Sequence, residues 1–264
     1  MIYRILSHVP HIIFKPAYDL YERYLFEKVK SGNIPKHVAI IMDGNRRWAR
    51  KLEKPPWYGH FFGSKKLEEI MEWCRELGIR TLTVYAFSTE NFRRSPEEVS
   101  ALMNLFEQKF KELLEDERVH RYGIRVNVIG RKEMLPENVR KAAEEVERAT
   151  RKYSNYILNI ALAYGGRSEI TDAVREIVRD VLAGKLKPGE IDEELIKRYL
   201  YNPGMPDPDI VIRTGGEERI SNFLLYQIAY SELFFVDVYF PEFRKIDFLR
   251  IIREFQKRQR RFGR

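Results

Sequence analysis

The sequence has a single cysteine among its 264 residues, so no disulfide can form within one chain. Chains without disulfides are typical of the reducing cytosol, and the expected location is therefore cytoplasmic. The cysteine, Cys74, has apolar neighbours at helical spacing on both sides. We interpret it as a small core residue rather than a nucleophile.

Long apolar runs and several well-known motifs are also missing. No stretch reaches the roughly 18 apolar residues that span a bilayer, and residues 1–14 show no signal-peptide cleavage pattern. The chain has no GxxxxGK phosphate loop, no GxGxxG fingerprint and no zinc-finger or RRM motif. Basic residues are interleaved with acids throughout, which makes nucleic acid the least favoured partner.

What the chain does have is a core and an excess of positive charge. Its hydrophobic content of 44% is enough for a folded core, and its net charge is +8 at pH 7. Once nucleic acid is set aside, an anionic membrane surface and a phosphorylated substrate remain as partners for such a chain.

Arginine follows the end of five predicted strands. The run Val38–Met42 is wholly apolar and passes directly into Asp43, Gly44, Asn45, Arg46 and Arg47. The other four predicted strands cover 81–87, 124–129, 156–163 and 210–212, and each also ends in polar residues that include arginine. Ligands of parallel α/β sheets bind at the carboxyl ends of the strands. We therefore expect a shared cationic rim that binds more than one phosphate group.

Helical and strand-like segments alternate along the chain without a long linker. A sixth strand is predicted at 233–239, and helices are predicted at 60–77, 96–117, 136–152, 167–183, 192–200 and 246–261. This order predicts an α/β fold, with a central, mostly parallel, six-stranded sheet flanked by helices in a single domain at 34–264.

Residues 1–33 stand apart and are predicted to form an N-terminal helical extension. Apolar residues between 17 and 30 follow a helical stripe. Two interpretations are open: the helix packs on the domain or on a partner subunit, or it lies on a membrane surface.

The strongest chemical signal is the acid at the end of the first predicted strand. Asp43 is followed at once by Gly44 and by two guanidinium groups, Arg46 and Arg47. A carboxylate beside such an anion clamp suits a Mg²⁺-bound phosphate, because the ion needs an oxygen ligand and the phosphate needs cations. A turn cap or a salt bridge at the strand end is the structural alternative for Asp43.

Five motifs then give the chain a resemblance to a known family. They lie at His37–Ala49, Tyr85–Phe92, Asn159–Arg167, Ile212–Leu224 and Ala229–Leu233. In this order and spacing they resemble the cis-prenyltransferases, the family of undecaprenyl and dehydrodolichyl diphosphate synthases, over about residues 37–263.

The resemblance implies an activity as well as a fold. Members condense isopentenyl diphosphate with an allylic diphosphate, either farnesyl or geranylgeranyl diphosphate, and add cis double bonds. The expected product is a long-chain cis-polyprenyl diphosphate, the undecaprenyl-type precursor of a glycosyl carrier lipid. The resemblance also implies Mg²⁺, a homodimer and a hydrophobic product tunnel. Peripheral contact with a membrane for product release is a further expectation, so the cytoplasmic protein is open to membrane association.

Roles for individual residues also follow from the resemblance. Asp43 and Glu232 would bind Mg²⁺, and Asn91 would serve proton removal, chiefly by positioning, because an amide is a poor base. The residues that would bind the two substrates are Gly44, Asn45, Arg46, Arg47, Trp48, His60, Ser88, Thr89, Glu90, Phe92, Arg94, Arg213, Arg219, Ile220, Ser221, Arg261 and Gly263. Structural alternatives stay open: a buried ion pair for Glu232, ordinary core for Trp48 and Phe92, a structural role for His60.

Two features near the motifs bear on assembly and on the choice of substrate: the end of the chain, and one position where the sequence differs from the family pattern. Arg261 and Gly263 match an element that reaches the diphosphate site across the dimer interface in this family, which favours a homodimer. A family arginine that binds phosphate is replaced by Pro56, which leaves the allylic substrate undetermined. The alternative function is a noncatalytic diphosphate- or isoprenoid-binding subunit, against which Asp43, Asn91 and Glu232 argue. The absence of a DDxxD pair disfavours a trans-type synthase.

Overall fold

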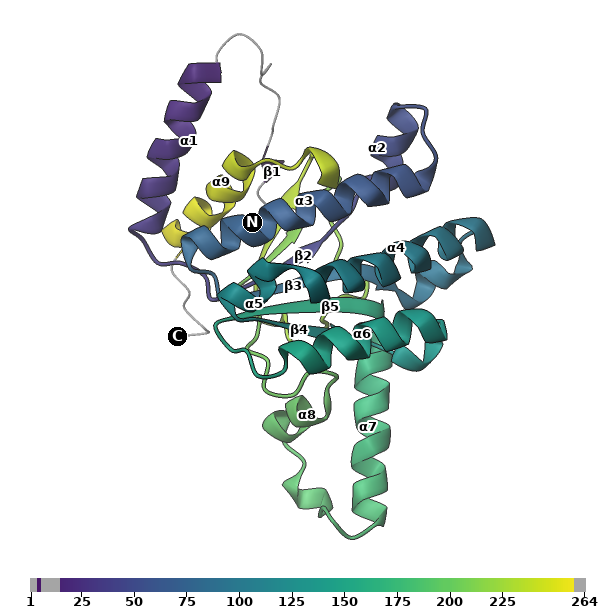
Figure 1. The fold of residues 1–264 in the computed structure, drawn as a ribbon. Coiled ribbons are helices and arrows are strands. Elements are labelled where there is room, and N and C mark those ends of the chain that lie inside the picture. Colours follow the sequence, from purple (N-terminus) through teal and green to yellow (C-terminus); the bar gives the residue numbers. More distant parts are fainter. Residues whose placement is uncertain (1–3, 6–14, 259–264) are drawn as a thin grey trace.

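A computed structural model describes residues 4–5 and 15–258 of the chain (Figure 1). These residues contain one sheet of seven strands, all paired in parallel, in the order β1-β7-β6-β2-β3-β5-β4. The strands are β1 (Arg4–Ile5), β2 (His37–Ile41), β3 (Thr81–Ser88), β4 (Ile124–Ile129), β5 (Tyr156–Tyr164), β6 (Ile210–Arg213) and β7 (Glu232–Val236). All six predicted strands are confirmed. The seventh, β1, is too short to leave a pattern in the sequence.

The strands are buried on both faces, as the apolar runs predict. In β2, Val38 and Ile40 belong to the larger apolar core, whereas Ala39 and Ile41 belong to a smaller core on the other face. This alternation follows from the two-residue period of a strand. A central strand covered on both sides is the usual arrangement in parallel sheets.

The helices cover the sheet on both faces. Their bounds are α1 (Lys15–Lys30), α2 (Asn45–Lys51), α3 (Pro56–Leu77), α4 (Pro96–Glu115), α5 (Glu117–Tyr122), α6 (Glu137–Thr150), α7 (Gly166–Leu182), α8 (Glu193–Tyr199) and α9 (Lys245–Lys257). The six predicted helices are confirmed to within a few residues, except that residues 259–261 of the last one lie outside the described residues. The sequence does not predict α5 as a separate helix. In Figure 1, α3, α4 and α6 lie together over one face, and α7 and α8 project beyond the other.

The start of α4 shows how local sequence fixes the element. Ser95 caps the helix, its Oγ accepting a hydrogen bond from the Glu98 N–H at 3.3 Å, and Pro96 occupies the first helical position. Ser at the cap and Pro at the first turn are the residues that this end of a helix prefers. The helix therefore starts just beyond the carboxyl end of β3, where the arginine-rich rim is predicted.

The first helix packs on the rest of the chain. Leu25 and Val29 of α1 are fully buried in the larger core, and the Val29 carbonyl accepts a hydrogen bond from the Gln256 side chain of α9 at 2.7 Å. Leu20 and Tyr24, which belong to the same predicted stripe, are exposed. Of the two interpretations of this helix, packing on the domain is the one that the structure shows. The boundary at residue 33 stays a prediction.

Two expectations about apolar segments can be compared with the structure. Cys74 is buried in the larger core, where burial raises the pKa of its thiol, in keeping with a structural role. Across the described ranges, no helix combines the length and apolar character that crossing a bilayer requires.

A cavity of about 770 Å³ runs between the sheet and the helices α3 and α4. One end is polar and lies at the carboxyl ends of the strands, where Asp43, Asn91 and Arg213 line it. The middle is apolar, with Leu67, Met71, Ala86, Leu102, Phe106 and Phe110 among its walls. The other end reaches the amino ends of the strands, at Arg80, Tyr122 and Tyr156. The space thus extends along most of the length of the sheet.

Candidate active site

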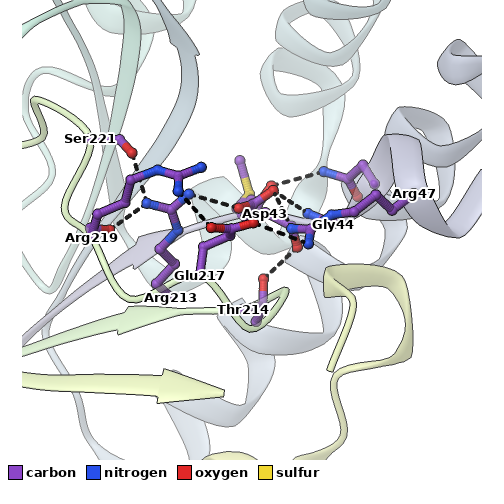
Figure 2. Close-up of polar contacts among 10 residues, drawn as sticks. Asp43, Gly44, Arg47, Arg213, Thr214, Glu217, Arg219 and Ser221 are labelled. Atoms are coloured by element: carbon purple, nitrogen blue, oxygen red, sulfur yellow. Dashed lines mark hydrogen bonds and ion pairs between the residues drawn. The ribbon is translucent and has the colours of Figure 1, made fainter. Parts of the chain in front are cut away.

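Asp43 and Arg213 meet because their strands are neighbours in register. β2 pairs with β6 so that Ile41 lies opposite Arg213, and Asp43 follows two residues later. An Asp43 carboxylate oxygen accepts a hydrogen bond from Arg213 Nη2 at 2.8 Å. Figure 2 shows Arg213 between Asp43 on one side and Ser221 on the other. The predicted convergence of strand ends is present at this pair.

Further donors hold the Asp43 loop. Its second carboxylate oxygen accepts from the Gly44 N–H at 2.6 Å and lies 3.2 Å from Arg47 Nη2. Its backbone carbonyl accepts from the Thr214 hydroxyl at 2.7 Å. Burial acts to raise the pKa of Asp43, but Arg213, Arg47 and the Gly44 N–H outweigh it and bring the pKa below its ordinary value. The group is therefore a carboxylate anion at neutral pH.

Arg213 is a buried cation with donors to spare. It is 4% exposed, and its Nη1 donates to Ser221 Oγ at 2.7 Å and to the Arg219 carbonyl. Its Nε is buried and has no hydrogen-bond partner. Asp43 already compensates the charge of Arg213, and an anion placed at the polar end of the cavity would give the Nε donor a partner. Arg219 and Ser221 line the same end.

In a second cluster, three predicted site residues lie close to a single carboxylate, that of Glu98. Glu98 Oε1 accepts from Arg94 Nη1 at 3.0 Å and lies 3.4 Å from Arg46 Nε and 3.7 Å from His60 Nε2. Glu98 is buried, and contact with the His60 ring, together with Arg94 and Arg46, lowers its pKa. Burial lowers the pKa of His60, so the ring is neutral at pH 7. Arg94 and His60 line the cavity, so this cluster borders the same space as Asp43.

Gly44 and Asn45 shape the first turn of α2. Gly44 has a φ of 102°, and a Cβ there would lie 2.9 Å from the Tyr239 Cα, so only glycine fits. Asn45 donates from its side chain to the Met42 carbonyl at 3.0 Å, while its Oδ1 is buried without a partner. This oxygen lies against Gly63 of α3, where an added Cβ would come within 2.5 Å of it, so the close packing of α2 on α3 requires glycine at position 63.

The segment after β3 is held in place by hydrogen bonds among its own residues. Asn91 accepts the Ser88 N–H on its Oδ1 at 3.0 Å, which makes a capping box at the start of the short 3₁₀ helix η1 (Thr89–Arg93). Ser88 and Asn91 line the cavity. Thr89 and Glu90 contact each other at 3.1 Å and do not line it. The structure therefore places Asn91 at the cavity with its amide oriented by the backbone.

The two predicted aromatic contacts lie outside the main cavity lining. Trp48 stacks on Tyr58 with ring centroids 5.9 Å apart, and its Nε1 donates to Glu242 at 3.1 Å. Phe92 meets Phe87 edge to face at 4.8 Å and packs against the larger core. Ile220 lines a separate small pocket with Glu90, Arg167, Asn222 and Leu225. Phe92 therefore packs as a core residue, whereas Trp48 is half-buried in an aromatic cluster with Tyr58 and Phe62 outside both apolar cores.

Glu232 is not brought to Asp43. It is the first residue of β7 and lies opposite Ile210, at the amino end of β6, whereas Arg213 and Asp43 lie at the carboxyl end. Its carboxylate pairs with Arg258 instead. Within this chain the expected pair of acidic ligands at one metal is therefore not formed, and the ion-pair alternative describes Glu232. Arg261 and Gly263 lie outside the described residues.

Comparison with known proteins identifies the family. The family model described as "Putative undecaprenyl diphosphate synthase" matches residues 41–263. The chain belongs to this family. A relative from Thermococcus kodakarensis is 88% identical over the whole of both chains and is named tritrans,polycis-undecaprenyl-diphosphate synthase (geranylgeranyl-diphosphate specific). A relative from Methanopyrus kandleri with the same name is 57% identical over 99% of this chain and 96% of its own.

Solved structures of this prenyltransferase family agree with the fold. Lavandulyl diphosphate synthase from Lavandula x intermedia, in complex with dimethylallyl diphosphate, superposes with a TM-score of 0.82 at 35% identity, over 90% of this chain and 100% of that one. A probable undecaprenyl diphosphate synthase from Campylobacter jejuni gives 0.72 at 35% identity, over 88% and 100%. The protein is thus a prenyltransferase of the polyprenyl diphosphate synthase class.

Three residues with clear places around the site were not predicted. Thr214 holds the Asp43 loop, Glu98 gathers the second cluster, and Asn222 links loops beside Ser221. Glu98 reads in the sequence as one of two acids in the first turn of a helix. Nothing in that pattern separates the buried acid from its exposed neighbour Glu97.

Proposed function

We propose that the protein condenses isopentenyl diphosphate with geranylgeranyl diphosphate, repeatedly, to give an undecaprenyl-type cis-polyprenyl diphosphate. The observation that carries this proposal is the Asp43–Arg213 pair at the polar end of an elongated cavity with apolar walls. The names of the curated relatives support geranylgeranyl diphosphate as the starter over farnesyl diphosphate.

The charges around the cavity suit two diphosphates. Two such anions in one pocket repel each other strongly, so the pocket must supply several cations away from bulk water. Arg213, Arg219 and Ser221 form one group that would bind isopentenyl diphosphate. Arg46, Arg94 and His60 form the other, around Glu98, and would hold the allylic diphosphate.

The residues at the polar end of the cavity suit a magnesium ion if oxygens of the substrate supply part of its coordination shell. The described residues contain no group of three or more His, Cys, Asp or Glu side chains that could enclose a metal. Mg²⁺ usually takes one or two carboxylates and completes its shell with water and phosphate oxygens. Asp43 would be the protein ligand, and the ion would neutralise charge on the departing diphosphate. Asn91, held by the Ser88 N–H, would position the group that loses a proton.

The cavity gives the growing chain a place out of water. Its apolar middle lies between α3 and α4, so an allylic tail whose diphosphate sits near Asp43 would extend towards Tyr122 and Tyr156. We propose that this space is the product tunnel. A homodimer, in which Arg261 and Gly263 complete the diphosphate site, and brief contact with a membrane during product release belong to the same proposal.

The test is a turnover assay of the purified chain with magnesium. Radiolabelled isopentenyl diphosphate is supplied with dimethylallyl, geranyl, farnesyl or geranylgeranyl diphosphate in separate reactions, and the products are separated by reversed-phase chromatography. We expect the highest kcat/KM with geranylgeranyl diphosphate, a long-chain product, and no product when the metal is chelated. Tight binding of both diphosphates without turnover would instead support a noncatalytic subunit.

A further inference from the structure

The turn between α2 and α3 presents an exposed apolar pair on a rigid corner. We define the α2–α3 corner as residues 50–57. Within it, Leu52 is 44% and Trp57 is 52% exposed. The corner is held by backbone hydrogen bonds from Leu52 to the Trp48 and Ala49 carbonyls and from Lys54 to the Ala49 carbonyl, and it contains two consecutive prolines. In Figure 1, α2 and the start of α3 stand out from the body of the molecule.

Basic residues neighbour this apolar pair in the sequence. Arg50, Lys51 and Lys54 are exposed within the corner, and Glu53 is its only acid. Arg50 and Lys54 make no ion pair with any residue in the described part of the chain, and Lys51 reaches Glu242 only at 4.0 Å. Lys65, more than two turns further along α3, lies over the rings of Phe61 and Phe62. The corner therefore combines an interfacial aromatic residue with uncompensated positive charge, the combination that binds anionic lipid headgroups.

An exposed apolar patch on α7 lacks this charge pattern. Val174, Val178 and Leu182 are exposed on α7. The basic residues beside them are paired: Arg175 with Asp172, Arg179 with Glu176, and Lys185 with Asp180. An anionic surface would gain little from cations that already have partners. The unpaired positive charge therefore favours the corner over the α7 patch as the site that binds a lipid surface.

We propose that the α2–α3 corner docks on the surface of an anionic lipid bilayer, with Leu52 and Trp57 entering the headgroup region. This inference rests on the proposed function, because it gives the lipid-like product a route out of the protein. Asn45 of α2 and His60 of α3, both close to the corner in the chain, line the cavity. Docking by this corner would bring the polar end of the cavity to the membrane surface.

The test is flotation of the full chain with lipid vesicles in the absence of any substrate. Vesicles of phosphatidylcholine, with and without phosphatidylglycerol, are compared at low and at high salt. We expect binding only to vesicles with phosphatidylglycerol, weakened by salt. Leu52→Ala with Trp57→Ala should lower the partition coefficient by about tenfold or more, and Arg50→Gln with Lys54→Gln by about fivefold for each charge removed.

The matched control is Val178→Ala with Leu182→Ala on α7, which should bind vesicles like the unmodified protein. All three double variants should keep their turnover in detergent, since none of these residues lines the cavity. Wild-type protein that stays in solution with phosphatidylglycerol vesicles, or corner variants that bind as well as wild type, would overturn the proposal. Corner variants that lost only their self-association, and bound vesicles like wild type, would also overturn the proposal. Because vesicle binding is measured without substrate, its failure is distinct from failure of the condensation assay.

Discussion

Asn222 donates a hydrogen bond from its side-chain amide to Glu90, 3.0 Å away and 132 positions distant in the sequence. Its Oδ1 accepts the Arg167 N–H at 2.8 Å, and its carbonyl accepts the Gly166 N–H at 2.7 Å. One residue therefore joins the segments that follow β3, β5 and β6. Its neighbour Ser221, with a φ of 48°, receives the Arg213 hydrogen bond. We infer that Asn222 is a positioning residue for the Arg213–Ser221 contact.

Asn222→Gly should therefore weaken isopentenyl diphosphate binding. Glycine tolerates the φ of 66° at this position, so the substitution removes the side chain without adding backbone strain. Loss of a hydrogen bond to a charged group predicts about a tenfold rise in KM for isopentenyl diphosphate, with little change in KM for the allylic substrate. Steady-state kinetics with each substrate varied in turn measure this. An equal rise in both KM values would contradict the assignment.

Asp43→Asn tests the proposed metal ligand. An amide keeps the shape of the side chain but loses the charge that Mg²⁺ and Arg213 require, so kcat should fall by at least about a hundredfold. Asp192→Asn is the matched control, because Asp192 caps α8, where its carboxylate accepts the Leu195 N–H at 2.7 Å. The control variant should keep its turnover. Near-normal turnover in Asp43→Asn at saturating magnesium would remove Asp43 from the mechanism.

Glu98→Gln tests the second cluster. Without the shared anion, Arg94, Arg46 and the His60 ring lose the group that sets their positions. We expect about a tenfold rise in KM for the allylic diphosphate and an unchanged KM for isopentenyl diphosphate. The neighbouring Glu97→Gln, on the exposed side of the same helical turn, serves as control. The assignment fails if both glutamate variants behave alike.

The Asp43–Arg213 pair could be predicted because it depends on topology alone. Apolar strands that alternate with helices predict a parallel sheet, and a parallel sheet collects the strand ends at one edge. The same rule already opposed the metal role of Glu232, since the strand predicted at 233–239 puts Glu232 at its amino end. The resemblance and the topology therefore disagree at this residue. The structure agrees with the topology, because Glu232 lies opposite Ile210.

Glu98 and Asn222 could not be predicted because their roles depend on tertiary packing. A helix whose exposed and buried faces both carry acids gives no periodic signal for a single buried carboxylate. Asn222 acts through groups on segments far apart in the sequence. Sequence periodicity reports which face of an element is buried, and it does not report which side chains from separate loops meet there.

A last prediction concerns acid stability and the buried His37. Its Nδ1 lies 2.7 Å from the Pro206 carbonyl, which accepts and so fixes the proton there, while Nε2 lies 2.7 Å from the Thr83 hydroxyl. Burial lowers the pKa of His37 from 6.5 to about 4. Between these pH values the unfolded chain binds a proton on this ring and the folded chain does not. The free energy of unfolding should therefore fall as the pH drops from 6.5 to 4, by up to about 3 kcal/mol.

Urea unfolding at a series of pH values measures this loss. His37→Gln should show a shallower decline between pH 6.5 and 4, because the group that titrates there is gone, even if its stability at pH 7 is lower. His60, whose pKa burial also lowers, contributes in the same direction, so some slope should remain in His37→Gln. An identical slope in His37→Gln and the unmodified protein would show that His37 does not carry the acid sensitivity.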